Sequence, residues 1–226
     1  EAAAQDFDLV LLARELGAMT AEFAAVDSLR DLHSAIETIG TPCVLKTRRF
    51  RYDGKGQALV ANPEQAIAAF QQFKGETCVL EQRLALDYEV SVVLARDESG
   101  IVTSFPAAAN CHRKGILDVS LVPARASTEL RAEAAALAAR IAEGLGYIGT
   151  LAVEFFVVRG ELLINEMAPR PHNSGHYTLD ACLTSQYEQQ VRALCSLPLG
   201  ETRAHSAAVM VNLLGDLWYE TTPAGH

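Results

Sequence analysis

The chain has 226 residues, half of them hydrophobic, a formal net charge of −9 and a sequence pI near 5.1. These values predict a globular protein with a sizeable core, and the acidic charge disfavours nucleic acid or an anionic membrane as a general partner. Five cysteines without a CxxC pair favour reduced thiols and a cytosolic location. The sequence shows neither a signal-peptide pattern nor an apolar run of about 18 residues, so we expect no membrane span.

The first third of the chain alternates helix and strand patterns, which predicts a compact α+β unit from about residue 20 to 80. Capping residues and glycines mark the helix ends. The predicted elements are a helix that ends at Gly17, a helix capped by Asp27 or Ser28 that ends at Gly40, strands at 43–47 and 57–60, and a helix from Pro63 to Gly75 with Asn62 as its cap.

From Thr77 the pattern changes to short strands without long helices between them, which predicts an antiparallel sheet. The strongest helical stripe of the chain follows, and after it a hairpin around Arg159-Gly160. The predicted elements are strands at 79–80, 89–95, 102–109 and 117–122, a helix at 128–145, strands at 151–158 and 161–166, a helix at 184–195 and a strand at 207–214.

A glycine loop at Tyr52-Asp53-Gly54-Lys55-Gly56-Gln57 lies between two predicted strands. Its backbone N–H groups and Lys55 can fold over a polyphosphate, since Gly54 and Gly56 leave room for close approach. The spacing matches neither a P-loop nor GxGxxG, and a plain hairpin turn is the alternative. Lys46, at the end of the preceding strand, is a second candidate phosphate ligand. We expect the loop to be a lid that nucleotide orders.

Glu154 and Glu166 lie on consecutive strands that are otherwise apolar. Two carboxylates that share a site repel each other unless a divalent cation or a proton lies between them, which predicts a magnesium site. Their spacing requires either a bulge or the three-residue connection 159–161 that we expect, because a two-residue turn alone would put them on opposite faces. The alternative is that one of the two glutamates faces solvent.

A strand signal at 162–164 runs into a polar stretch that contains Pro169 and Pro171, which predicts a stiff, exposed loop at a strand end. Acidic, cationic, imidazole, amide and hydroxyl groups follow one another there and suit anion and metal recognition. A zinc site made by His172 and His176 with His112 or a cysteine is an alternative, but Pro171 and Gly175 disfavour a helix that would put both imidazoles on one face, and no CxxC or HExxH motif supports it. The polar residues of this loop are Glu166, Arg170, His172, Asn173, Ser174 and His176.

Four stretches, taken in their order along the chain, are together specific to one enzyme family. They are Lys46-Thr47-Arg48-Arg49 with Tyr52 to Gln57, Glu81-Gln82, Asn110-x-His112-x-x-Gly115-Ile116-Leu117, and Ile164 to His176. The chain resembles the 5-(carboxyamino)imidazole ribonucleotide synthase family of ATP-grasp enzymes, and the HNSGH sequence at 172–176 is the most specific part of that resemblance. The residue at 51 departs from it, because the family usually has glycine where Arg51 stands.

The resemblance implies an α+β fold of the ATP-grasp type, in which two subdomains hold ATP. It further implies the ATP- and magnesium-dependent carboxylation of aminoimidazole ribonucleotide by bicarbonate, through carboxyphosphate, by a cytoplasmic homodimer. Another ATP-grasp amine ligase of purine synthesis, or a nucleotide-binding module without turnover, is the alternative. Since the family has a nucleotide-fold domain before this region and a small domain after it, we expect the first to be absent and the second to be truncated. The implied boundaries are 1–19 for the end of a preceding domain or linker, 20–84 for the lid subdomain, 85–200 for the large subdomain and 201–226 for the start of the C-terminal domain.

The resemblance also assigns roles to residues. For ATP it implies the phosphate ligands Lys46, Tyr52, Asp53, Gly54, Lys55, Gly56 and Gln57, the adenine hinge Glu81, Gln82, Arg83 and Leu84, the ribose ligand Glu89, and the contacts His112, Asn165 and Glu166. For magnesium it implies Glu154 and Glu166. For the ribonucleotide and bicarbonate it implies Tyr52, Arg170, His172, Asn173 and Ser174, with Arg170, Tyr52 and Lys55 as the catalytic residues.

Overall fold

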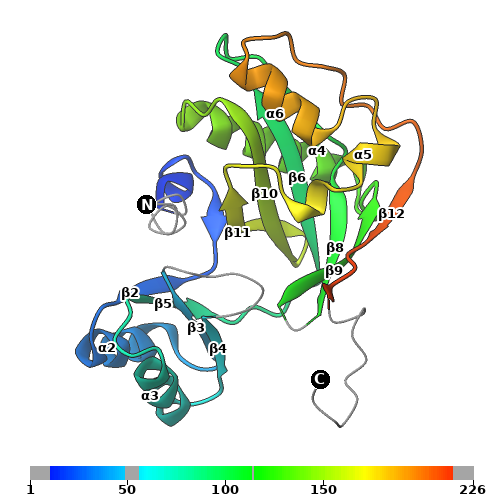
Figure 1. The fold of residues 1–226 in the computed structure, drawn as a ribbon. Coiled ribbons are helices and arrows are strands. Elements are labelled where there is room, and N and C mark those ends of the chain that lie inside the picture. The colour runs from blue at the N-terminus through cyan, green and yellow to red at the C-terminus, as the bar shows by residue number, and fades with distance from the viewer. Residues whose placement is uncertain (1–10, 49–55, 114, 216–226) are drawn as a thin grey trace, which may run out of the picture.

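The computed structural model describes residues 11–48, 56–113 and 115–215 and shows two sheets with helices packed on them (Figure 1). A four-stranded sheet has the order β2-β5-β3-β4, and an eight-stranded sheet has the order β1-β11-β10-β6-β8-β9-β12, with β7 paired to β6. The strands are β1 Met19–Thr20, β2 Phe23–Val26, β3 Cys43–Thr47, β4 Gln57–Val60, β5 Cys78–Gln82, β6 Tyr88–Arg96, β7 Val102–Ser104, β8 Ala108–Arg113, β9 Ile116–Val122, β10 Gly149–Val158, β11 Glu161–Ala168 and β12 Ala208–Val211. The helices are α2 Leu29–Ile39, α3 Pro63–Gln72, α4 Thr128–Gly144, a 3-10 turn Asn173–Gly175, α5 Thr178–Ala181 and α6 Gln186–Leu194.

The smaller sheet and its two helices form a small lobe, as the sequence predicts. Ser28 accepts a hydrogen bond from the Asp31 N–H at the start of α2, and Asn62 accepts one from the Gln65 N–H at the start of α3. These caps satisfy backbone donors that the first helical turn leaves without partners. Apolar residues of both helices and of all four strands make one core in this lobe.

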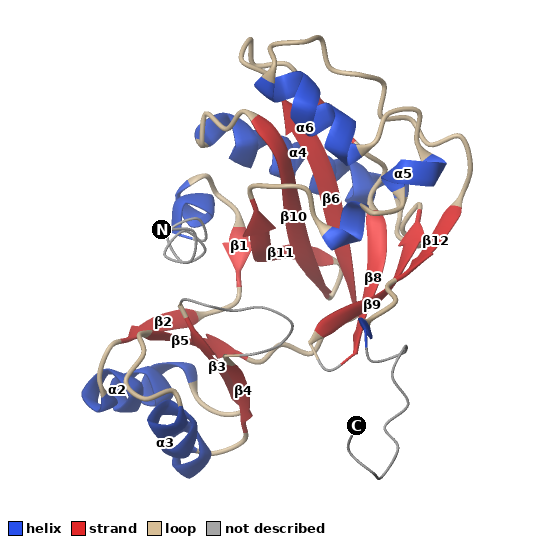
Figure 2. Cartoon of the chain, viewed as in Figure 1, coloured by secondary structure: helices blue, strands red, loops and turns tan. Residues whose placement is uncertain are grey.

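The larger sheet has a helix-covered core on each face, which Figure 2 shows as helices on both sides of its strands. On one face α4 packs against alternate residues of β6 and β10, such as Val92 and Val153. On the other face α5 and the segment before it cover residues such as Val93 and Ala152. Among the described residues, no helix is both long and apolar enough to cross a membrane.

Most of the larger sheet is antiparallel, as predicted, but several features differ from the prediction. The strand expected at 79–80 as part of this sheet is β5, which instead lies between β2 and β3 in the smaller sheet. The strand expected at 102–109 is two strands, β7 and β8, because Pro106 lies between them and has no N–H to donate to a neighbouring strand. In addition, β1 pairs in parallel with β11, and β12 pairs with β9 at the opposite edge. Residues 19–20 and 208–211 are therefore joined to the larger sheet.

Candidate functional site

One face of the larger sheet changes from apolar to polar along its strands. Register pairing aligns Ser91, Glu154 and Glu166 in one row across β6, β10 and β11. Residues directly opposite on antiparallel strands point to the same face, and this face is also that of Val93 and Ala152. The carboxylates of Glu154 and Glu166 therefore share a face, as the magnesium prediction requires.

The convergence of these two carboxylates depends on a β-bulge at Asn165. Val158 pairs with Glu161, so the turn has only the two residues Arg159 and Gly160, both with positive φ, and the expected three-residue connection is wrong. The register then shifts, because Phe155 pairs with Ile164 and Glu154 pairs with Glu166. The extra residue, Asn165, turns the rest of β11 over, which is the bulge alternative of the sequence analysis.

Without that bulge, Glu166 would point to the wrong side of the sheet. Ile164 lies in the apolar core against α4, and a regular strand would place Glu166 on the same side, two residues later. Because of the bulge, the side chain of Met167 packs in that core and the side chain of Glu166 lies on the polar face. Asn165 Nδ2 also lies 3.5 Å from Glu154 Oε2, so the bulge residue contacts the carboxylate that it aligns.

Glu154 is the most deeply buried acid of the site, with 7% exposure. Burial, followed by the charge of Glu166, raises the pKa of Glu154 from its usual 4.5 to about 7. A carboxylate pair with this property takes up a proton or a divalent cation readily. The described residues contain no group of three or more His, Cys, Asp or Glu side chains that could hold a metal ion. Two carboxylates alone would leave the other ligands of a divalent cation to phosphate oxygens or water. The zinc alternative gains no support from the described residues.

The raised pKa of Glu154 predicts a pH effect on the stability of the metal-free protein. Between about pH 4.5 and 7 the folded state retains a proton that the unfolded state releases, so stability falls as pH rises through this range. Relative to Glu154→Gln, the wild type should lose about 3 kcal/mol of unfolding free energy across this range. Denaturant unfolding of both proteins at several pH values measures this difference. A constant difference from pH 4.5 to 7.5 would contradict the prediction.

Glu89 and His112 come to the same face from β6 and β8. His112 Nδ1 lies 2.8 Å from Glu89 Oε2, and both side chains are about one-fifth exposed. Burial alone would lower the pKa of His112, but the contact with the Glu89 carboxylate and the charges of Glu89, Glu154 and Glu166 raise it overall. The structure thus brings these two predicted ATP ligands next to the predicted metal ligands, although they are far apart in the sequence.

The loop after β11 folds back over this face. His172 Nδ1 lies 2.9 Å from Ser174 Oγ and 3.8 Å from Glu154 Oε1. Burial, together with the positive charge of Arg170, lowers the pKa of His172 to about 4, so its imidazole is neutral at neutral pH. Asn173 Oδ1 accepts a hydrogen bond from the Ser174 N–H at 2.9 Å.

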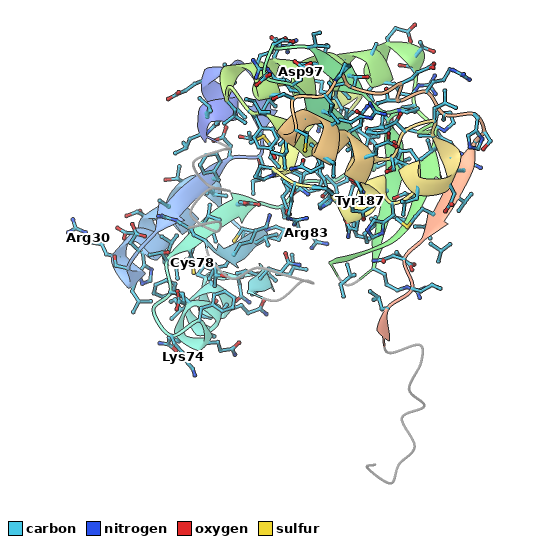
Figure 3. All side chains as sticks on the ribbon, turned by 45° about the horizontal axis from the view of Figure 1, so that its top comes forward. Arg30, Lys74, Cys78, Arg83, Asp97 and Tyr187 are labelled. Carbon is cyan, nitrogen blue, oxygen red and sulfur yellow. The ribbon has the colours of Figure 1, made fainter. Side chains whose placement is uncertain are left out.

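The prediction that this loop is exposed is wrong for most of its length. Arg170 is exposed, but His172 is mostly buried and Ser174 and Gly175 are buried, because the loop packs between the sheet and α6. Its end also contacts that helix. Figure 3 labels Tyr187 on α6, and the ring of Tyr187 stacks on His176 with the centroids 6.5 Å apart.

The predicted nucleotide residues of the smaller lobe form a second group. Lys46 on β3 makes an ion pair with Glu81 on β5, and its side chain is only 12% exposed, so it is not a solvated lysine. Gln57 begins β4 opposite Lys46. The hinge residues Gln82, Arg83 and Leu84 end β5 and lead out of this lobe, and Arg83 is labelled between the two lobes in Figure 3.

Within the described part of the chain, no hydrogen bond or ion pair joins Lys46 or Glu81 to the glutamates of the larger sheet. Tyr52, Asp53, Gly54 and Lys55 lie outside the described residues, so their predicted roles stay predictions. Gly56 is described, and its carbonyl accepts a hydrogen bond from the Thr47 N–H at 2.8 Å.

Three buried polar residues of this face were not among the predicted site residues. Ser91 is aligned with Glu154, and Asn110 and Ser120 are aligned with Glu89 in the next row. Ser120 Oγ donates to Asn110 Oδ1 at 2.8 Å, whereas Ser91 Oγ and Asn110 Nδ2 are buried without a hydrogen-bond partner. A polar residue inside an otherwise apolar strand is the signal that could have identified them.

A protein-family model described as "ATP-grasp domain" matches residues 11–187. Among curated proteins, the N5-carboxyaminoimidazole ribonucleotide synthase of Bacillus subtilis (strain 168) is 46% identical over 201 residues, which cover 88% of this chain and 53% of that protein. The corresponding enzyme of Brucella melitensis biotype 1 is 45% identical over 89% of this chain and 57% of its own length. The chain spans about half the length of the curated relatives it matches.

Solved structures agree with these matches. A crystal structure of the ADP complex of an N5-carboxyaminoimidazole ribonucleotide synthetase superposes with a TM-score of 0.88 at 44% identity, over 92% of this chain and 56% of that one. The Staphylococcus aureus N5-carboxyaminoimidazole synthetase complexed with ADP superposes with a TM-score of 0.87 at 38% identity, over 93% of this chain and 57% of that one.

Proposed function

Since this chain belongs to the ATP-grasp family, we propose that it contributes the ATP, magnesium and substrate-loop residues of a 5-(carboxyamino)imidazole ribonucleotide synthase. The family match and the α+β architecture confirm the fold class predicted from the sequence. The proposed reaction uses ATP to carboxylate the amine of aminoimidazole ribonucleotide with bicarbonate. The observation that carries the proposal is the convergence of Glu154 and Glu166 with the loop of His172 and Ser174 on one face.

The charge of the described side chains supports separate roles for the two lobes. Lys46, held by Glu81 in the smaller lobe, offers a partly buried cation to the phosphates, and the hinge at 81–84 offers backbone groups to adenine. On the larger sheet, Glu89 and His112 offer a carboxylate and an imidazole to the nucleotide sugar and phosphates. The barrier to phosphoryl transfer arises mainly from the charge on the transferring group. A protein lowers it by positioning the reactants and by placing charged side chains such as these beside them.

The carboxylates of Glu154 and Glu166, with Asn165 beside them, would hold magnesium. When bound, the cation neutralises phosphate oxygens during phosphoryl transfer. The loop then receives the other reactants. Arg170 is exposed and offers a guanidinium fork to an anion, while the neutral imidazole of His172 and the Ser174 hydroxyl offer uncharged contacts beside it.

In the proposed reaction, an oxygen of bicarbonate attacks the γ-phosphorus of ATP. ADP leaves, and carboxyphosphate forms. The amine of the ribonucleotide then attacks the carboxyl carbon, loses a proton, and phosphate leaves.

We propose the boundaries 20–84 for the lid subdomain and 85–200 for the large subdomain, with 1–19 and 201–226 as flanking segments. A cytoplasmic homodimer is part of the same proposal, and all five cysteines are free thiols, which suits a reducing compartment.

Isothermal titration tests this function on the chain itself. We expect heat from ATP with magnesium first, and then heat from aminoimidazole ribonucleotide added to the nucleotide complex. Lys46→Met should remove most of the ATP binding, because it deletes the partly buried ammonium group that we expect to contact the phosphates. Binding of ATP without the ribonucleotide would favour a nucleotide-binding module instead, and absence of both would contradict the proposal.

A further inference from the structure

Gln186, a buried residue of α6, holds the loop that follows β11 at His172. Gln186 Oε1 accepts a hydrogen bond from the His172 N–H at 2.9 Å, and Gln186 Nε2 donates to the His172 carbonyl at 2.7 Å. Gln186 is fully buried. An amide that pairs with both backbone groups of one residue fixes the orientation of that residue as well as its position.

Gln186 also connects to the end of the same loop. Its backbone N–H donates to Thr178 Oγ1 at 2.9 Å, and Thr178 Oγ1 donates to the Gly175 carbonyl at 2.7 Å. Both Thr178 and Gly175 are buried. The turn from His172 to Gly175 is therefore attached to α6 at both of its ends.

The fit between the loop and this amide is close. A Cβ atom at Gly175 would lie 2.5 Å from Gln186 Oε1, which is shorter than any real Cβ contact. The backbone conformation of Gly175 does not itself demand glycine, since its φ is not positive. The amide is thus the nearest reason for a glycine at 175, because a larger residue would displace it.

The position of His172 matters because its ring lies inside the candidate site. His172 Nδ1 is 3.8 Å from Glu154 Oε1 and 2.9 Å from Ser174 Oγ. We propose that Gln186 is a positioning residue of this enzyme, whose amide sets where the His172 imidazole and the Ser174 hydroxyl meet the ribonucleotide and bicarbonate. This role rests on the proposed function of the loop.

The same helix supplies a matched control. Gln189 is also fully buried, and its side-chain amide pairs with both backbone groups of Gly200, at 2.9 Å and 2.6 Å. Gly200 lies outside the residues assigned to the site. Gln186→Met and Gln189→Met therefore delete equivalent pairs of hydrogen bonds with a side chain of similar length, one pair at the site and one away from it.

Amide hydrogen exchange of the chain without ligands tests the attachment directly. In Gln186→Met the amides of His172 and Gly175 should exchange at least about tenfold faster, because His172 loses its acceptor and the turn loosens. In Gln189→Met only the Gly200 amide should become faster. Unchanged exchange at His172 and Gly175 in a folded Gln186→Met protein would overturn the proposal, whether or not the enzyme turns over.

Steady-state carboxylation separates positioning from general stability. Gln186→Met should lower kcat/KM for aminoimidazole ribonucleotide by at least about tenfold while the KM for ATP stays within a few-fold, since a displaced loop loses reacting geometry. Gln189→Met should leave both constants near the wild-type values. Equal losses in the two variants would overturn the positioning role. If wild-type protein does not carboxylate, the proposed function fails and the exchange result alone decides what Gln186 holds.

Gly175→Ala is a second route to the same amide, for the case in which Gln186→Met does not fold. The added methyl group would displace the Gln186 side chain without removing it. We expect the same faster exchange at His172 and the same selective loss for the ribonucleotide. A folded Gly175→Ala protein with wild-type exchange at His172 and wild-type kinetics would count against the role of the amide.

Discussion

Glu166→Gln should lower magnesium-dependent ATP turnover by several orders of magnitude while the fold stays intact. The substitution keeps the shape of the side chain but removes one of the two carboxylates that the bulge at Asn165 brings together. In this variant the cation keeps only one of its two negatively charged protein ligands. It is therefore held less well and stabilises the transferring phosphoryl group less. Steady-state ADP release at varied magnesium concentration measures the effect.

Glu161→Gln is the matched control for this experiment. Glu161 starts the same strand, is exposed, and undergoes the same change of charge at the hairpin end. It should turn over ATP like the wild type. Glu166→Gln should also lower the pKa of Glu154 in the metal-free protein, since the charge of Glu166 is one cause of its elevation. ADP release within a few-fold of wild type in Glu166→Gln would remove Glu166 from the metal site.

Arg170→Ala should lower carboxylation turnover by at least about a hundredfold and leave the ATP dissociation constant within a few-fold. Its guanidinium is exposed at the loop, and its Nη1 donates a hydrogen bond to the Pro171 carbonyl at 3.1 Å. It can therefore reach an anion beside His172. Removing one such charge from the reacting centre costs about 3 kcal/mol of transition-state stabilisation.

The readout for Arg170→Ala pairs calorimetric ATP binding with carboxylation rates. Arg140→Ala is a suitable control, because Arg140 is an exposed arginine of α4, which covers the opposite face of the sheet. It should leave both measurements unchanged. If Arg170→Ala loses ATP affinity in parallel with turnover, then Arg170 acts on the nucleotide and the assignment of the loop to the ribonucleotide and bicarbonate is wrong.

The sequence by itself determined α2, α3, α4, α6 and most of the strands, but neither α5 nor the 3-10 turn at 173–175. The residues at which α2 and α3 begin follow from Ser28, Asn62 and Pro63, whose effects reach only three or four residues along the chain. The hairpin of β10 and β11 follows from Arg159-Gly160 between two apolar runs. Local patterns suffice there because the hydrogen bonds concerned join near neighbours. The two glutamates were also identified from sequence, as acids in otherwise apolar strands.

Only the tertiary structure decided which residues meet. A strand pattern of period two places Glu166 with Ile164 against α4, and the bulge that reverses this is a property of how β11 pairs with β10. The meeting of Glu89 with His112 likewise depends on the register of β6 and β8. The loop at 172–175 looked exposed because its residues are polar. It is buried because Gln186, on a helix that follows it, supplies the hydrogen bonds that its backbone would otherwise take from water.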